Sequence, residues 1–128
     1  MEIINKKHKE ITVNKTVGNR IFIKFCNEKQ ISFSLSACRE YGLSEDLFLH
    51  IVNDENKWFF YVNNDPDGFK LHQQPKRTTL DIYNQALVHL FIKRTQHTLP
   101  CKFPLSLTGN KQDGHHLIEI HHNHLMTN

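Results

Sequence analysis

Hydrophobic and polar side chains alternate in several short runs along the chain, with the two-residue period of a β-strand that buries one face. The alternating runs cover residues 20–25, 31–34, 69–72 and 101–107. Continuous β-branched and aromatic runs at 47–52 and 58–62 also predict strands, and further strands are predicted at 80–83 and 116–120. Clusters of turn-forming residues separate them, at 53–57, 63–68 and 108–114. The pattern predicts a mainly β protein.

A first short helix is predicted between two of these runs. Ser34 can cap a helix over residues 35–41, because its hydroxyl can accept from an exposed backbone N–H of the first turn. Gly42 stands where a helix often ends in the left-handed conformation, and Leu43 follows as the apolar residue that folds back on the last turn.

A second helix is predicted over residues 85–95, with Asn84 as its cap. Its apolar stripe is expected to consist of Leu87, Leu90, Phe91 and Arg94.

In the strand that follows, Pro104 cannot donate a backbone hydrogen bond, so we expect that strand at a sheet edge.

The two halves of the chain repeat the order strand, helix, strand, turn, strand when Ala37 is laid on Ala86. We therefore predict an α+β, mostly β fold, in which two degenerate β-α-β-β units pack into one barrel-like or swapped-hairpin domain. The predicted parts are an N-terminal arm or edge strand at 1–17, a first unit at 18–74 and a second unit at 75–128.

Residues 29–62 resemble the swapped-hairpin half of AbrB/SpoVT-type transcription regulators, through a strand, a short helix ending in Gly-Leu, and a hairpin of two strands. The resemblance implies DNA binding and a homodimer. The sequence has Lys29-Gln30 in place of the family's glycine-arginine, Ser34 in place of its proline, and only Arg39 of its paired helix arginines. The whole chain also resembles small uncharacterised proteins of phages and mobile elements, which implies no activity.

The composition excludes only a few classes of protein. The formal net charge is +3, with an isoelectric point near 8.8, which is mildly basic. No segment approaches the roughly 18 continuous apolar residues of a membrane span, and the first ten residues lack the apolar core of a signal peptide. Cys26, Cys38 and Cys101 are widely spaced within apolar patterns, so we interpret them as reduced core thiols of a cytoplasmic protein.

Catalytic motifs are absent from the sequence. It contains no nucleophile elbow, phosphate-binding glycine loop or dinucleotide fingerprint, so we predict a protein that is not an enzyme and needs no cofactor. The histidine-rich segment 115–124 could place His115, Glu119 and His121 on one strand face as metal ligands. Their spacing matches no zinc module, and we interpret the segment as a frayed polar terminus with no metal.

Nucleic-acid binding is the first functional hypothesis. Duplex binding would use Lys29, Arg39, Lys76 and Arg77 on the phosphates, whereas single-strand binding would use Phe22, with Trp58 or Tyr61, as stacking surfaces. The candidate nucleic-acid-binding residues are Arg20, Lys24, Lys29, Arg39, Lys76 and Arg77.

The alternative hypothesis is a protein-interaction module from a phage or mobile element, acting as an inhibitor of a host protein or as an assembly component. It requires an exposed apolar patch, for which the run Trp58 to Tyr61 is the candidate. The competing interpretation of that run is a strand with both faces covered by the core.

Overall fold

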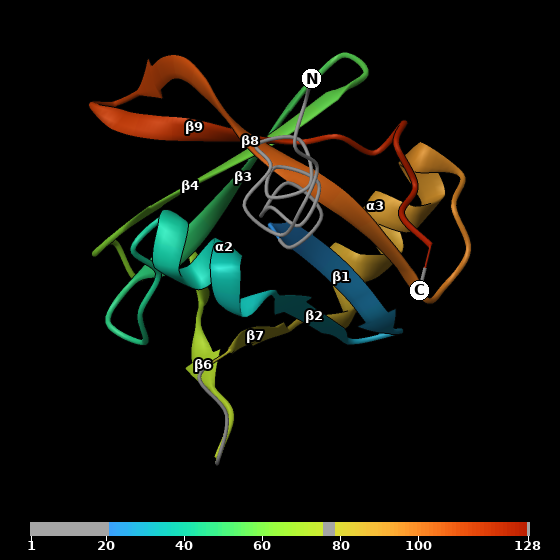
Figure 1. Ribbon diagram of the computed structural model, residues 1–128, viewed down its shortest axis with the longest axis horizontal. Helices are drawn as coiled ribbons and strands as arrows, with labels where there is room; N and C mark the ends of the chain where they lie inside the picture. Colours follow the sequence, from blue (N-terminus) through green and yellow to red (C-terminus); the bar gives the residue numbers. More distant parts are fainter. Residues whose placement is uncertain (1–20, 76–78, 128) are drawn as a thin grey trace, which may run out of the picture.

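The computed structural model describes residues 21–75 and 79–127. Within these ranges the chain forms a nine-stranded antiparallel sheet and two helices (Figure 1). The strands are β1 (Phe22–Asn27), β2 (Gln30–Phe33), β3 (Phe48–Asp54), β4 (Lys57–Asn63), β5 (Phe69–Lys70), β6 (His72–Gln73), β7 (Leu80–Tyr83), β8 (Cys101–Gln112) and β9 (His115–Ile120), and the helices are α2 (Leu35–Glu40) and α3 (Gln85–Thr95).

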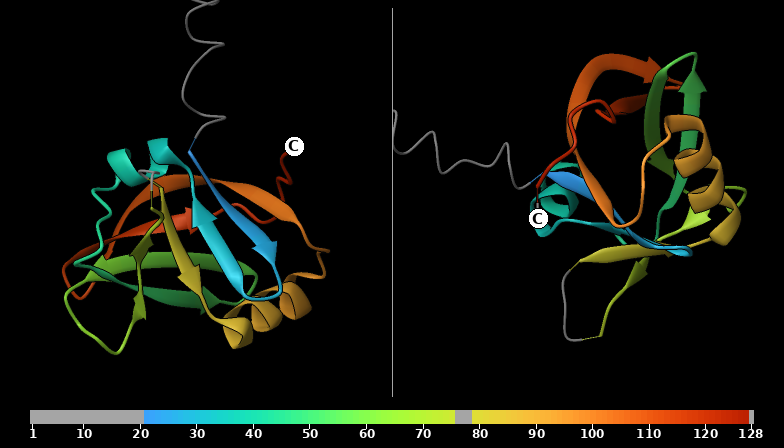
Figure 2. Two further views of the ribbon diagram at one scale, coloured as in Figure 1. Left: turned by 90° about the horizontal axis from the view of Figure 1, so that it is seen from below. Right: turned by 90° about the vertical axis from the view of Figure 1, so that its right-hand side faces the viewer.

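The sheet curls into a nearly closed barrel because its two outermost strands follow one another in the chain. The strand order is β5-β3-β4-β9-β8-β1-β2-β7-β6, so β5 pairs with β3 at one end and β6 pairs with β7 at the other. A single residue, Leu71, connects β5 to β6 and is 0% exposed. The extended segment 69–73 therefore joins the two ends of the sheet (Figure 2).

The barrel is built from two similar halves that pair symmetrically. β2 pairs with β7 through Ile31 and Ile82, and β4 pairs with β9 through Phe60 and Ile118. β2 and β7 each precede the helix of their own half, and β4 and β9 are each the second strand after that helix. This architecture confirms the predicted mostly β, barrel-like fold with two β-α-β-β units. The proposed boundaries between parts stay a prediction, and the arm at 1–17 lies outside the described residues.

Both helices begin as the sequence predicts. The Ser34 hydroxyl accepts from the backbone N–H of Ala37 at 3.2 Å, and the Asn84 side chain accepts from that of Leu87 at 2.9 Å. The caps thus make Ala37 equivalent to Leu87, which shifts the expected alignment on Ala86 by one residue. α2 ends at Glu40 with Tyr41 as its C-cap, and Gly42 follows with a φ of +62°, in the left-handed conformation predicted for it.

The core lies inside the barrel, and α3 covers it on the side opposite α2 (Figures 1 and 2). The Phe91 ring of α3 stacks on that of Phe25 with centroids 4.2 Å apart and meets Trp58 edge-on at 4.9 Å. The buried stripe of α3 contains Val88, whereas Leu90 is 41% exposed. The predicted stripe was wrong about Leu90 because the face that packs on the barrel is centred on Phe91.

β8 differs from the prediction at two points. It extends to Gln112, and the tight turn to β9 consists of Asp113 and Gly114, both with positive φ. Pro104 lies inside the sheet rather than at an edge, because β8 changes partner there, from β1 to β9. Its carbonyl accepts from His121 N at 3.0 Å, just after β9 ends, and the His121 carbonyl accepts from His124 N at 3.0 Å, so the His121 carbonyl needs no ladder donor at position 104.

Replacing Leu71 with alanine should lower the free energy of unfolding by about 2–5 kcal/mol, because the substitution leaves a cavity where the barrel closes. Urea unfolding followed by fluorescence measures the loss. The control is Leu90→Ala on the exposed side of α3, which should change stability by less than about 0.5 kcal/mol. Equal effects of the two substitutions would show that segment 69–73 does not hold the barrel closed.

Candidate nucleic-acid interface

The outer face of β1 and its neighbours carries basic and aromatic side chains. Ile23 and Phe25 point into the core, so Phe22 and Lys24 point outward from the barrel. This arrangement confirms the predicted division of the strand into two faces. On β8, Lys102 lies directly opposite Lys24. Like charges directly opposite one another on adjacent strands destabilise a sheet, so this pair favours an anion on the outer face.

Phe22 lies within reach of one of these lysines. The Lys102 ammonium nitrogen is 4.7 Å from the centroid of the Phe22 ring, which is a cation–π distance. Among the residues that the structure describes, no carboxylate forms an ion pair with Lys24 or Lys102. The backbone of Phe22 is fixed, because its N–H donates to the Ser34 hydroxyl at 3.1 Å. The Phe22 ring, with Lys102 over it and Lys24 on the same strand face, therefore lies on a rigid part of the barrel.

A shallow groove of about 490 Å³ runs beside these side chains, between the outer face of β1 and β2 and the start of α2. Hydroxyl groups and one ammonium group dominate its polar lining. The lining residues are Phe22, Lys24, Cys26, Gln30, Ser32, Phe33, Ser34, Leu35, Ser36, Thr79 and Asp81.

A buried carboxylate closes one side of the groove. Asp81 is 1% exposed, and its Oδ2 accepts from Gln30 Nε2 at 2.9 Å, from Gln74 Nε2 and from the Tyr83 hydroxyl at 3.2 Å. Its Oδ1 is buried with no hydrogen-bond partner. The negative charge is thus held at the β7 side of the groove, away from the lysine pair at the β1 and β8 side.

Cys26 faces this outer surface. It lies at a bulge between β1 and β2 and is only partly buried, so the prediction of three core thiols holds for Cys38 and Cys101 but is wrong for Cys26. Burial raises the pKa of the Cys26 thiol, while the nearby Lys24 ammonium lowers it and Asp81 raises it further. Burial raises the pKa of Cys101 to about 11.

Of the predicted nucleic-acid-binding residues that the structure describes, one lies in the groove. Lys24 lines it, Lys29 is exposed in the β1–β2 turn, and Arg39 is exposed in the last turn of α2. Lys29 and Arg39 therefore lie beyond opposite ends of β2. The remaining predicted residues, Arg20, Lys76 and Arg77, lie outside the described residues.

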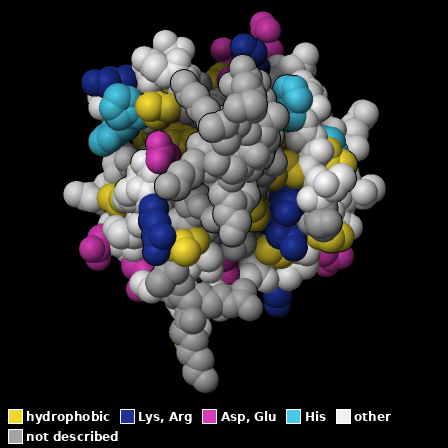
Figure 3. All heavy atoms as spheres, viewed as in Figure 1, with side chains coloured by type: hydrophobic (Ala, Val, Ile, Leu, Met, Phe, Trp, Pro, Cys, Tyr) yellow, Lys and Arg dark blue, Asp and Glu magenta, His cyan; other side chains and the backbone are white. Residues whose placement is uncertain are grey.

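Sequence reasoning missed Lys102. The signal was present, since Lys102 alternates with the buried residues Cys101 and Phe103, but only the strand pairing brings it opposite Lys24. Figure 3 shows Lys and Arg side chains in separate patches on the α2, β1 and β8 face, some of them beside hydrophobic side chains.

The histidine-rich segment does not bring His115, Glu119 and His121 together as metal ligands. His115 stacks on Tyr61 at 5.9 Å, whereas His121 contacts Glu119 at the far end of β9. The described residues contain no group of three or more potential metal ligands. This segment is not frayed as predicted, because His124 N donates to the His121 carbonyl at 3.0 Å and Met126 N, two residues later, donates to the Lys102 carbonyl at 2.9 Å.

The aromatic run of β4 divides between core and surface. Trp58 and Phe60 are fully buried, and Phe59 and Tyr61 are half-buried on the outer face. The run is therefore neither an entirely exposed patch nor a strand with both faces covered.

Within the described ranges, neither helix is long and apolar enough to cross a membrane. Comparison of the chain with protein-family models, curated proteins and solved structures gave no match.

Alkylation of the folded protein with iodoacetamide at pH 8 should modify Cys26 first, because Cys38 and Cys101 are buried. Mass spectrometry of tryptic peptides measures the order. Lys24→Ala should slow the modification of Cys26, since removal of the ammonium raises the pKa of the thiol. Equal rates for all three cysteines without denaturant would contradict the outward orientation of Cys26.

Proposed function

We propose that the protein binds single-stranded nucleic acid on the outer face of β8, β1 and β2. The observation that carries the proposal is the Lys24–Lys102 pair beside the Phe22 ring. Single-strand binders combine a cationic surface for the phosphates with an aromatic side chain on which a base stacks. Bound phosphates would also relieve the repulsion between the two opposed ammonium groups.

The groove supports a single strand over a duplex. The hydroxyls of Ser32, Ser36 and Thr79 provide hydrogen bonds along a narrow path beside Lys24. Lys29 and Arg39 lie beyond opposite ends of β2, so they do not extend the Lys24–Lys102 pair into one continuous basic surface. Binding at this face needs no catalytic group and no cofactor.

The resemblance of residues 29–62 to AbrB/SpoVT-type regulators supports a regulatory role for this binding. Under the proposal the protein acts on nucleic acid in the cytoplasm. The same resemblance suggests that it works as a homodimer.

The double substitution Lys24→Glu/Lys102→Glu should weaken binding to a labelled single-stranded oligonucleotide by at least about tenfold. Loss of two phosphate contacts should also reduce the slope of log affinity against log salt by about 1.4. Fluorescence anisotropy between about 50 and 200 mM salt measures both quantities. Phe22→Ala should cost about 1–3 kcal/mol of binding free energy and leave the salt slope unchanged.

Lys93→Glu/Lys111→Glu is the matched control, because it changes the net charge equally at exposed sites on α3 and the β8–β9 hairpin. If both double variants lose affinity equally, binding depends on net charge and not on this face. An affinity of the unmodified protein that does not change with salt concentration would contradict the proposal.

A second candidate function is assembly through the outer face of β3, β4 and β9. Half-buried apolar side chains gather there and include Phe48, Val52, Phe59, Tyr61 and Leu117. The Tyr61 ring is stacked between those of His50, at 4.9 Å, and His115, at 5.9 Å. An apolar sheet face of this kind suits a protein partner, as the interaction-module hypothesis requires.

Phe59→Ser/Tyr61→Ser should convert a self-associated protein to a monomer, because it removes the central aromatic pair of that face. Light scattering coupled to size-exclusion chromatography measures the mass of both proteins. Assembly through this face is excluded if the unmodified protein is already monomeric at the highest concentration tested.

A further inference from the structure

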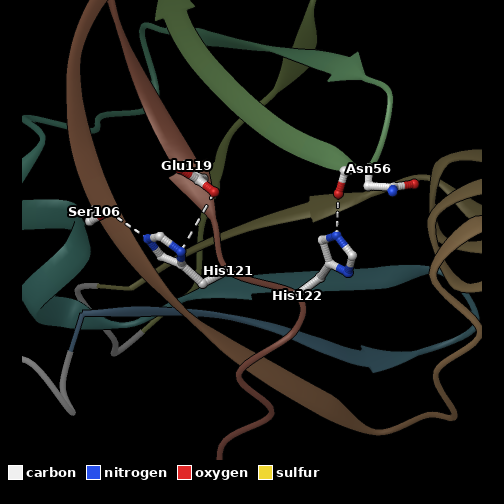
Figure 4. A network of polar contacts seen from close by, with 5 residues as sticks. All are labelled: Asn56, Ser106, Glu119, His121 and His122. Atoms are coloured by element: carbon white, nitrogen blue, oxygen red, sulfur yellow. Dashed lines mark hydrogen bonds and ion pairs between the residues drawn. The ribbon is translucent and has the colours of Figure 1, made fainter.

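Three side chains on the outer face of β8 and β9 form a connected polar chain (Figure 4). Ser106 and Glu119 are direct partners in the β8–β9 ladder, and His121 follows Glu119 by two residues. The Ser106 Oγ lies 2.5 Å from His121 Nε2, and His121 Nδ1 lies 3.6 Å from Glu119 Oε2. The imidazole thus stands between a hydroxyl and a carboxylate, with one ring nitrogen directed at each.

The geometry allows proton transfer from Ser106 to His121. In the tautomer that carries its proton on Nδ1, on the side of the Glu119 carboxylate, the lone pair of Nε2 faces Ser106. In that tautomer the Ser106 hydroxyl donates its hydrogen bond to Nε2. Nucleophile, base and acid stand in the order found in hydrolases that use an activated serine.

Backbone hydrogen bonds hold the main chain of His121 on both sides. His121 N donates to the Pro104 carbonyl at 3.0 Å, and the His121 carbonyl accepts from His124 N at 3.0 Å. The side chain of the next residue, His122, donates a hydrogen bond from its Nε2 to the carbonyl of Asn56. The fold therefore fixes the main chain that carries the base, and the imidazole itself contacts Ser106 and Glu119.

The three groups are accessible to a substrate. The side chains of His121 and Glu119 are 28% and 23% exposed, and Ser106 is partly exposed on the same face. The His124 ring lies 5.9 Å from that of His121 and adds a nitrogen donor beside the pair.

A groove of about 540 Å³, which is a volume typical of small-molecule sites, lies along the same face of β8, and its lining includes Pro104 but not Ser106, His121 or Glu119. Pro104 lies on the face of β8 that carries Ser106, two residues earlier. The end of the chain forms the opposite wall, held by the hydrogen bond from Met126 N to the Lys102 carbonyl. Apolar walls from Pro104, Leu125 and Met126 suit a short acyl chain, and Lys102, His124 and Thr127 complete the lining.

We propose that Ser106, His121 and Glu119 form a hydrolytic site for small carboxylic esters, with the acyl group in this groove. Ser106 Oγ attacks the ester carbonyl as its proton moves to His121 Nε2. Collapse of the tetrahedral intermediate breaks the bond to the alcohol, which leaves with that proton. Water, activated by the same nitrogen, then releases the carboxylic acid and restores the serine. Glu119 is a positioning residue that keeps the base in the required tautomer.

The three residues of the site lie outside the Lys24 groove, whereas Lys102 borders the acyl groove and also belongs to the proposed nucleic-acid face. Either proposal can fail while the other stands.

The test is reaction of the full chain with a fluorophosphonate probe, in which a serine oxygen displaces fluoride from phosphorus and the base takes the proton. Peptide mass spectrometry should place the adduct on Ser106. Ser106→Ala should abolish labelling, and His121→Gln should slow it by about 100-fold or more, the usual contribution of a general base. Hydrolysis of p-nitrophenyl butyrate should fall in parallel.

Glu119→Gln distinguishes positioning from a purely structural role. It should lower kcat with little change in KM, and Glu119→Asp should restore part of the rate, because the carboxylate orients the base and does not bind the substrate. Ser44→Ala, in the loop before β3, is the control and should label like the unmodified protein. An unlabelled Ser106 in the folded protein, or equal labelling of Ser106→Ala, overturns the proposal.

Discussion

The pairing of the two sheet ends through segment 69–73 is the constraint on which the rest of the structure depends. An open antiparallel sheet would expose unpaired N–H and C=O groups at both edges. Here β5 and β6 satisfy β3 and β7 within one extended stretch, and the connecting Leu71 fills the core. Closure fixes the curvature of every other strand, so it also fixes which side chains face outward together.

Core side chains fill the centre of the barrel. Phe25, Phe91 and Phe103 pack within 4.2–6.2 Å of one another between centroids. The groups of both proposed sites lie on the outer face, where alternation along each strand places them. The Lys24–Lys102 pair and the Ser106–Glu119 pair both arise from β8, which faces β1 along one part and β9 along another.

The outer face also brings unlike chemistries close together along β8. Lys102, Pro104 and Ser106 succeed one another on the same side of the strand. Lys102 belongs to the proposed nucleic-acid face and also lines the groove that contains Pro104. Asp81 lies on the far side, two strands beyond β1, where its buried charge is held by neutral donors and leaves the two lysines without a counter-ion among the described residues.

The sequence by itself determined the local structure, because caps and alternation act over a few residues. Ser34, Asn84 and Gly42 define where the helices begin or end, and the period-2 pattern separates Phe22 and Lys24 from the core. Only the tertiary structure decided which outward residues meet. The opposition of Lys24 to Lys102 and of Ser106 to Glu119 depends on strand register between segments far apart in the chain, which local patterns do not encode.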